Sequence, residues 1–401
     1  MTQGTTSAKP FPWTGLFVLS ALIFTSVTSE FLPTGLLPDI ARDLKVSESQ
    51  VGLLITLFAA TVVVSAAPLA ILTRRFPRKH LVITVLFVFI IANVLAALAP
   101  TYEWLAMARV LGGLAHGLFW AVVGGYTGYL VPKRQLGRAV AITAGGGTAA
   151  FILGVPVGTA LGHAVGWRLA FAAIAVIILA LTLVAARLLP HIQHIESLAT
   201  GEIALPLRRD RSIPGVVLIC VTVILIMLGH NIFYTYIAPF LISPVGVDPS
   251  AIAGVLFLYG GAGAIGLALA GFFADRFPRA GLVGALVIVS LAVLVIALFP
   301  SQPVIVISTM VIWSIAFGGA PAMLQTLLLH TASSRIRDVA SAYLTTSFNI
   351  AIGGGAFVGG ILLDNTSILV LPYADVVITL VAIVVFVVGD VVVRRGLTRS
   401  R

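Results

Sequence analysis

Long apolar runs alternate with short polar segments along almost the whole chain. Six runs lie near residues 14–37, 51–72, 80–99, 103–130, 138–162 and 168–189, and six more near 213–243, 250–273, 280–299, 303–330, 338–363 and 371–393. Each is comparable in length to the ~20 residues that a helix needs to cross a bilayer. The pattern therefore predicts an all-α integral membrane protein with twelve transmembrane helices.

The longest polar segment separates the first six runs from the last six. It predicts an N-terminal half at 1–189, a cytoplasmic linker at 190–212 and a C-terminal half at 213–401. A shift of 201 residues places Arg75-Phe76-Pro77-Arg78 on Arg276-Phe277-Pro278-Arg279. This repeat predicts two pseudo-symmetric six-helix halves, an arrangement typical of rocking-type transporters.

Composition and charge agree with a bilayer environment. Hydrophobic residues make up 59% of the chain and charged residues 9%, whereas a soluble domain carries about 25% charged residues. The net charge is +10, but most Lys and Arg residues lie at the termini and in the even-numbered connections. This asymmetry indicates membrane orientation with both termini in the cytoplasm, and no nucleic-acid partner is expected.

The sequence contains no signature of an enzyme, a metal site or a bound cofactor. The single cysteine, Cys220, excludes an intrachain disulfide and a cysteine metal site. A phosphate-binding G-x-x-x-x-G-K-[ST] segment, an H-E-x-x-H segment and a G-x-S-x-G segment are all absent from the sequence. We therefore predict neither catalysis nor direct use of ATP.

Two ionisable residues within the predicted spans are the main candidates for chemistry. Glu30 lies in the first run and His116 in the fourth, and ionisable groups inside a membrane mark function by default. A desolvated carboxyl group can exchange a proton near neutral pH, and imidazole titrates in the same range. We predict that both couple protons and contact substrate; the alternative for each is a structural hydrogen bond.

Polar and aromatic residues of the second half are candidates for substrate binding. The seventh run carries His230, Asn231 and Tyr234, followed by Tyr236, and the eleventh carries Asn349. Such groups suit a cavity for a sugar or a drug, because rings stack on flat apolar faces while amides form hydrogen bonds. For the tyrosines the alternative is an aromatic belt at the membrane interface.

Several segments together resemble the major facilitator superfamily. The resemblance rests on residues 28–41, 115–120, 154–159, 236–240 and 348–350. Within the superfamily, the sequence resembles most the drug:proton antiporter branch with twelve spans. Within that branch it is most similar to bacterial sugar efflux transporters, which export arabinose and thiogalactosides. The resemblance implies the major facilitator fold and proton-coupled efflux of small sugars by alternating access. It also implies a monomer in the bacterial cytoplasmic (inner) membrane.

The resemblance also implies a set of residues that control conformational change. These residues are Arg75, Arg78, Asp275, Arg276, Arg279, Gly154, Pro156 and Gly158. In the first half, Arg74 stands where the family has an acidic residue, which puts the state-locking role of that loop in doubt. Two other functions remain open: a drug:proton antiporter that exports chloramphenicol-like compounds, and a membrane sensor that does not transport.

Overall fold

The computed structural model describes residues 11–73, 76–132, 135–190, 210, 212–333 and 336–399. Regular structure within these ranges is helical throughout. Twelve helices of the described part are long and apolar enough to cross a membrane, which confirms the fold predicted from the apolar runs. The division at 190–212 stays a prediction, because most of that linker lies outside the described residues.

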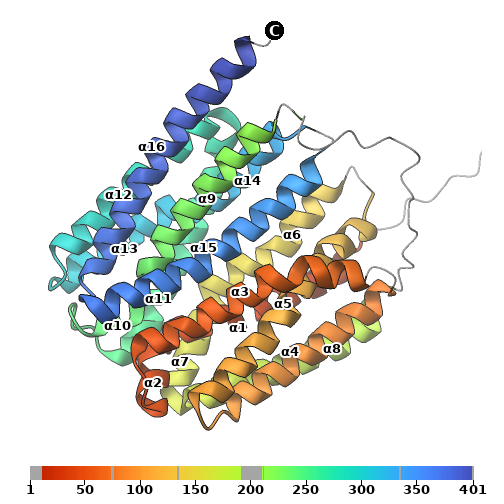
Figure 1. Cartoon of the computed structure of the whole chain (residues 1–401). Helices are drawn as coiled ribbons and strands as arrows, with labels where there is room; N and C mark the ends of the chain where they lie inside the picture. The colour runs from red at the N-terminus through yellow and green to blue at the C-terminus, as the bar shows by residue number, and fades with distance from the viewer. Residues whose placement is uncertain are drawn as a thin grey trace, which may run out of the picture.

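The helices of the first half occupy one side of the molecule and those of the second half the other (Figure 1). The first six spans are α1 (Trp13–Gly35), α3 (Glu48–Thr73), α4 (Arg78–Ala97), α5 (Tyr102–Leu130), the combined α6 (Leu136–Ala149), η2 (Ala150–Gly154) and α7 (Val155–Val165), and α8 (Trp167–Leu188). The last six are α9 (Ile213–Tyr234), α11 (Ile252–Arg276), α12 (Pro278–Leu298), α13 (Pro303–Gly318) with α14 (Ala320–Thr331), α15 (Arg337–Asn365) and α16 (Val370–Arg399). Short helices α2 (Leu37–Leu44), α10 (Ile237–Ile242) and η4 (Pro249–Ala251) lie in the connections.

Prolines account for the two spans that are broken into separate helices. Pro156 cannot donate a backbone hydrogen bond to the preceding turn, and its ring crowds that turn. The chain widens into the π-helical segment η2 immediately before it. Pro321 follows the boundary between α13 and α14 in the same way. The predicted run 213–243 likewise contains two helices, since α9 ends at Tyr234 and α10 begins at Ile237.

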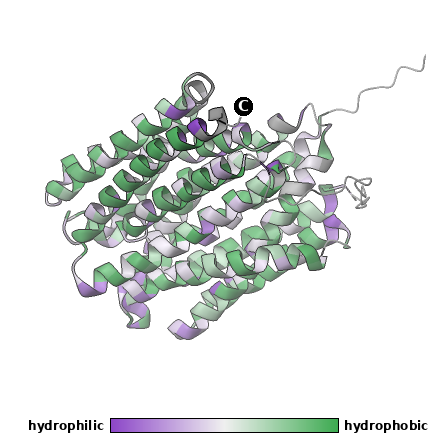
Figure 2. Cartoon of the chain, turned by 45° about the horizontal axis from the view of Figure 1, so that its top comes forward, coloured by the Kyte–Doolittle hydropathy of each residue, from purple (hydrophilic) through white to green (hydrophobic). Residues whose placement is uncertain are grey.

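The outer surface of the bundle is apolar, as a lipid-facing surface must be. Val64 and Val304 are 73% and 78% exposed, and Phe17 is 58% exposed. Figure 2 shows hydrophobic residues along the lengths of the helices, with several hydrophilic ones gathered towards their ends. Large exposed apolar surfaces are rare on soluble monomers, so this distribution indicates a protein surrounded by lipid.

A row of glycines brings α1 against the fifth span. Gly154, Gly158 and Gly162 recur every four residues, and a Cβ atom at each would overlap a side chain of α1, at Thr28, Leu32 and Leu36 respectively. Glycine is therefore required for the close approach of the two helices. The packing holds the segment of α1 around Glu30 at a fixed position.

The two halves meet at the end of the bundle that carries α2 and α10, which we call the α2/α10 end. The Ser49 hydroxyl on α3 donates to Asp364 on α15 at 2.6 Å. The Thr56 hydroxyl, two turns further along α3, donates to the carbonyl of Gly353 at 2.9 Å. These contacts close this end, opposite to the end at which α8 ends and α9 begins, which we call the linker end.

Tyr236 reinforces this closure and does not line the cavity, contrary to its pairing with Tyr234 in the sequence analysis. Its side chain is fully buried, and its hydroxyl donates to the carbonyl of Ala356 at 2.8 Å. The same hydroxyl occupies the space where a Cβ atom of Gly52 on α3 would lie. Tyr236 therefore fills a contact between the halves. The chain turns after α9, which carries this ring away from the cavity.

Candidate substrate cavity

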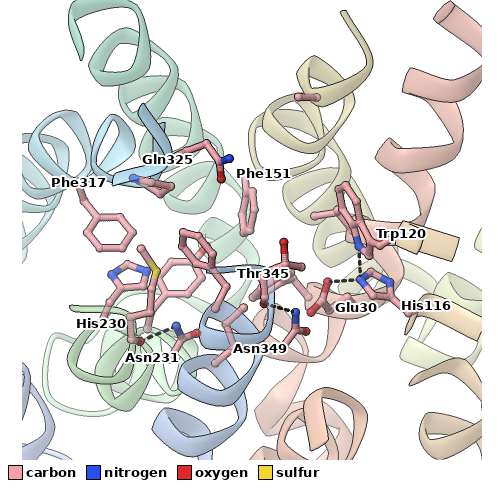
Figure 3. Close-up of a pocket in the computed structure, with 18 residues that line it drawn as sticks. Glu30, His116, Trp120, Phe151, His230, Asn231, Phe317, Gln325, Thr345 and Asn349 are labelled. Atoms are coloured by element: carbon pink, nitrogen blue, oxygen red, sulfur yellow. Dashed lines mark hydrogen bonds and ion pairs between the residues drawn. The ribbon is translucent and has the colours of Figure 1, made fainter. Parts of the chain in front are cut away.

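A cavity of about 520 Å³ lies between the two halves, on the side of the Thr56–Gly353 contact that faces away from the α2/α10 end. All six residues predicted to bind substrate line it. Glu30 and His116 come from the first half, whereas His230, Asn231, Tyr234 and Asn349 come from the second. Figure 3 shows Glu30 and His116 on one side of the space and His230 and Asn231 on the other, with Asn349 between them in this view.

Glu30 of α1 and His116 of α5 are in direct contact. Glu30 Oε2 lies 3.4 Å from His116 Nε2, and the side chains are 6% and 2% exposed. The other ring nitrogen, Nδ1, lies 2.9 Å from the Ser26 hydroxyl. Trp120, one helical turn after His116, donates its indole N–H to Nε2 at 2.6 Å. Glu30 and His116 are the two residues predicted from the sequence to couple protons. In the structure they lie in contact on two different helices.

The hydrogen bonds define the tautomer of His116. Because an indole N–H can only donate, Nε2 accepts from Trp120 and carries no proton. Nδ1 then carries the proton and donates to Ser26, so the ring is neutral. Protonation of Nε2 requires Trp120 to give up its hydrogen bond. In this arrangement the Glu30 carboxyl is the group that can accept a proton without breaking a bond.

Arg109 fills a gap in the hydrogen bonds of α1 at Pro33. Proline has no N–H, so the carbonyl of Ser29, four residues earlier, lacks its helical partner. Arg109 donates to the carbonyl of Ser29 at 2.9 Å and to that of Glu30 at 2.8 Å. Its guanidinium carbon also lies 4.2 Å from the centre of the Phe58 ring. Arg109 therefore holds the backbone of α1 where Glu30 projects into the cavity.

Two amide side chains of the second half, Asn231 and Asn349, face Glu30 and His116 (Figure 3). Asn231 donates to the carbonyl of Met227 at 2.8 Å, and Asn349 donates to that of Thr345 at 3.0 Å. These bonds within α9 and α15 fix the orientation of both amides. In the described part of the chain no hydrogen bond to either amide oxygen occurs. Both oxygens are therefore acceptors for a bound ligand.

His230 presents its edge to the surrounding groups, because other rings cover its faces. Phe317 stacks on it with ring centres 3.8 Å apart and 9° between the planes, and Tyr234 stacks at 5.0 Å and 17°. Its Nδ1 atom is buried and has no hydrogen-bond partner among the described residues. His230 can therefore contact a ligand through a nitrogen but cannot stack against it.

Aromatic residues complete the wall of the cavity, and the sequence analysis missed them. They are Phe31, Trp120, Phe151, Phe317 and Phe348. Phenylalanine is common throughout apolar runs, so no pattern marks the ones that face a cavity. For Trp120 a signal did exist, since a residue four positions after His116 lies on the same face of a helix.

A buried carboxyl group in the last span was also missed. Asp375 of α16 is 1% exposed. The rule that drew attention to Glu30, that ionisable groups inside a membrane mark function, applies equally to Asp375. This residue is outside the cavity described above and is considered below.

The residues assigned to conformational control lie at several places. Gly154, Pro156 and Gly158 lie where η2 and α7 pack against α1. Arg279, on α12, forms an ion pair with Asp390 on α16 at 2.9 Å. Arg78 begins α4, and Asp275 and Arg276 end α11, where the structure describes their backbone only. Arg75 lies outside the described residues.

Comparison with known families decides the identity of the fold. The model of the Major Facilitator Superfamily matches residues 19–244 and 219–400. The chain belongs to this superfamily. Its members are transporters, so the expectation that the chain is not an enzyme agrees with its family. Membership of this superfamily also implies a small-molecule substrate and a multi-pass position in a bacterial membrane.

Relatives within the superfamily agree with the resemblance to sugar efflux transporters. A protein of Helicobacter pylori named a probable sugar efflux transporter is 31% identical over 350 residues, which cover 87% of this chain and 88% of the relative. A protein of Mannheimia succiniciproducens with the same name is 30% identical over 374 residues, covering 93% and 92%. The resemblance inferred from the sequence is therefore confirmed.

Solved structures of the superfamily share the fold at low sequence identity. An inward-facing, unoccupied bacterial homologue of the human lysosomal transporter Spinster has 17% identity and a TM-score of 0.71, covering 98% of this chain and 99% of that one. A variant of the nucleoside transporter NupG has 16% identity and a TM-score of 0.75, covering 94% and 98%. At these identities the likeness establishes the fold alone.

Proposed function

We propose that the protein exports small sugars in exchange for protons by alternating access. The observation that carries this proposal is the position of Glu30, in contact with His116, opposite Asn231 and Asn349 in one cavity between the halves. Transporters of this architecture bind substrate near the midplane at the interface of their repeats. The names of the relatives support sugars as cargo.

The donors and acceptors in the cavity match the chemistry of a sugar. Each sugar hydroxyl can donate one hydrogen bond and accept others. Ionised Glu30 and the two amide oxygens would accept from such hydroxyls, and the rings of Phe31 and Phe348 would pack against the apolar face of the sugar ring. A cavity of about 520 Å³ falls in the usual range for small-molecule sites.

Proton coupling would follow from competition for Glu30. An ionised carboxylate accepts strong hydrogen bonds from substrate hydroxyls, whereas the protonated form loses part of this capacity. A proton that arrives from outside would therefore displace the sugar towards the outside. The neutral tautomer of His116, held by Trp120, would direct the proton to Glu30.

The proposed orientation of the chain assigns each end of the bundle to one side of the membrane. With both termini in the cytoplasm of a bacterial inner membrane, the closed α2/α10 end would face outwards, and the structure would correspond to an inward-facing state. Rocking of the halves would separate Ser49 from Asp364 and open the cavity outwards. Each chain contains a complete cavity, so a monomer would suffice.

Binding assays on the purified protein test this function. Labelled arabinose, a labelled thiogalactoside and labelled chloramphenicol would be offered separately at acidic and at neutral pH. We expect the wild type to bind a sugar more weakly at acidic than at neutral pH, and Glu30→Gln to bind it weakly at both pH values. Binding of chloramphenicol without either sugar would contradict the proposed cargo.

Drug export is the second candidate, because a specific feature of the cavity favours it. A second space of about 370 Å³ adjoins the first and shares Phe151, His230, Tyr234 and Phe317 with it. Its remaining lining consists mainly of glycine, alanine and other small residues. An apolar compartment of this kind would accommodate a compound with fewer hydroxyl groups than a sugar.

A further inference from the structure

Asp375 is an ionisable group inside the membrane that the proposed transport cycle does not use. It lies in the α2/α10-end third of α16 and is 1% exposed. Its Oδ1 atom accepts a hydrogen bond from the Thr379 hydroxyl at 3.0 Å. Its Oδ2 atom is buried and has no partner among the described residues. No ion pair in that part of the chain includes Asp375, so an ionised form would lack a counter-charge, which is costly in a bilayer.

The carboxyl group of Asp375 rests directly on α9. A Cβ atom at Gly229 would lie 2.9 Å from Asp375 Oδ1. Glycine at this position therefore leaves the space that the carboxyl group occupies. The next residue along α9 is His230, which lines the substrate cavity. Movement of Asp375 would thus act on the backbone beside a cavity residue.

Five buried polar atoms of the second half have no hydrogen-bond partner among the described residues. Besides Asp375 Oδ2, they are Ser290 Oγ, the Tyr259 hydroxyl, Trp313 Nε1 and His230 Nδ1. The Trp313 ring lies 5.2 Å from each of the His230 and Tyr259 rings, and Tyr259 is within electrostatic range of Asp375. Buried polar atoms are almost always paired. These unpaired atoms are therefore exceptions that indicate a functional role for this part of the second half.

The second space connects this group to the substrate cavity. His230 and Tyr259 both line it, and His230 also lines the first cavity. The second space therefore joins the substrate cavity to Tyr259, which is within electrostatic range of Asp375. The Tyr259 hydroxyl, His230 Nδ1 and Asp375 Oδ2 are all buried in the state described. Water would therefore reach Asp375 only after a change of conformation.

Few other ionisable groups face Asp375. Tyr259 of α11 is within electrostatic range of Asp375. On α9, which contacts Asp375 through Gly229, the nearest titratable groups along the chain are His230 and Tyr234. Helix α12 also packs on α16, and its one titratable side chain, Arg279, pairs with Asp390 at the linker end. On α15 the nearest carboxyl to the α2/α10 end, Asp364, accepts from Ser49. None of these supplies a positive charge to Asp375 in the arrangement described.

We propose that Asp375 is a second proton-binding group of the transporter, located in its C-terminal half. The Asp375 carboxylate takes a proton from hydronium in one conformation of the cycle, and the neutral acid returns the proton to water in the other conformation. The inference rests on the proposed proton-coupled cycle for its role in transport. Proton binding at Asp375 can be measured without any substrate.

Infrared spectroscopy of the purified protein in lipid tests proton binding directly. A protonated carboxylic acid and a carboxylate give separate bands, and a titration follows their exchange. We expect a titrating carboxyl signal in the wild type and in Glu30→Gln that is lost in Asp375→Asn. In the control Asp364→Asn the signal is retained. If Asp375→Asn removes no titrating signal, the proposal is overturned.

A second variant keeps the test sharp should Asp375→Asn fail to fold. Thr379→Val leaves the carboxyl group in place and removes the hydroxyl bound to Oδ1. We expect it to shift the pH at which the Asp375 signal titrates. An unchanged titration in a folded Thr379→Val protein would contradict the assignment to Asp375.

Transport measurements separate this inference from the proposed function. If the wild type moves a sugar under a pH gradient, Asp375→Asn is expected to bind that sugar but to show a weaker dependence of flux on pH. Flux in Asp375→Asn with the pH dependence of the wild type would overturn the role in coupling. If the wild type moves no sugar, the proposed function fails, and the infrared titration alone decides whether Asp375 binds a proton.

Discussion

At the scale of single residues, the cavity depends on hydrogen bonds that hold Glu30 in place. Arg109 bridges two carbonyls of α1, and Ser26 and Trp120 hold His116 beside the carboxyl group. Each contact joins α1 and α5 or aligns two groups on α5. The position of the carboxyl group thus results from several weak interactions within a small volume.

The pairing of Arg109 with Pro33 gives a prediction about stability. Arg109→Leu should lower the free energy of unfolding by on the order of 1–3 kcal/mol for each buried carbonyl that it leaves unpaired. Adding Pro33→Ala should restore part of this loss, because the new N–H can donate to the carbonyl of Ser29. Thermal unfolding of both variants in detergent would measure the difference. Equal unfolding temperatures for the single and double variants would rule out the compensation.

The amides of the second half give a prediction about affinity. Asn231→Ala and Asn349→Ala should each weaken sugar binding by about tenfold, since a hydrogen bond contributes roughly 1–1.5 kcal/mol and 1.4 kcal/mol corresponds to a factor of ten. Gln325→Ala, at the edge of the same cavity, is the matched control with a smaller expected effect. Equilibrium binding of a labelled sugar to the purified variants is the measurement.

At the scale of elements, helix α1 is positioned by the glycines of the fifth span. Gly154 approaches Thr28, and Gly158 approaches Leu32, so that no side chain separates the helices. The segment η2 also contacts the second half, because a Cβ atom at Gly260 of α11 would overlap the carbonyl of Phe151. One span therefore contacts both α1 and the opposite half.

The glycine contacts predict a difference between substitutions in one span. Gly154→Ala should destabilise the protein by about 1–3 kcal/mol, because it forces apart a close helix contact. Gly145→Ala is the control, since the space at Gly145 is open, and it should be neutral or stabilising by up to about 1 kcal/mol. Unfolding temperatures of the two variants give the comparison. Equal effects would mean that the contact at Thr28 is not required.

The sequence predicted the elements of the fold better than their contacts. Twelve spans follow from run length. The breaks near Pro156 and Pro321 were not predicted, because α1 and α3 contain Pro33 and Pro68 without a break.

Glu30 and His116 stood out because charge is rare in apolar runs. The aromatic residues around Glu30 and His116 could not be recognised in the same way. Tryptophan and phenylalanine both occur in apolar runs, and no sequence pattern marks the ones that face a cavity. Asp375 could have been found by the rule that identified Glu30.

At the scale of the whole molecule, the halves are closed at the α2/α10 end by packing of α3 against α15 and by specific polar contacts. Tyr236 fills the space at Gly52, and Ser49 and Thr56 form hydrogen bonds to α15. A transporter must break these contacts in every cycle.

Closure at this end can be tested by cross-linking. In a protein that also carries Cys220→Ser, the pair Ser49→Cys and Asp364→Cys should form a cross-link in the state described, because the native side chains are 2.6 Å apart. The cross-link should stop transport, and reduction should restore it. Binding from the linker side should persist. Full transport by the cross-linked protein would show that this end does not open.

Gradient-driven flux in proteoliposomes tests the central claim most directly. Labelled arabinose or thiogalactoside would be supplied on the linker side, with the opposite side acidic, to the wild type, Glu30→Gln and Asn349→Ala. We predict uphill movement of a sugar by the wild type, its loss in Glu30→Gln, and only a reduced rate in Asn349→Ala. Uphill movement by Glu30→Gln with an unchanged pH dependence would contradict the assignment of proton coupling to Glu30.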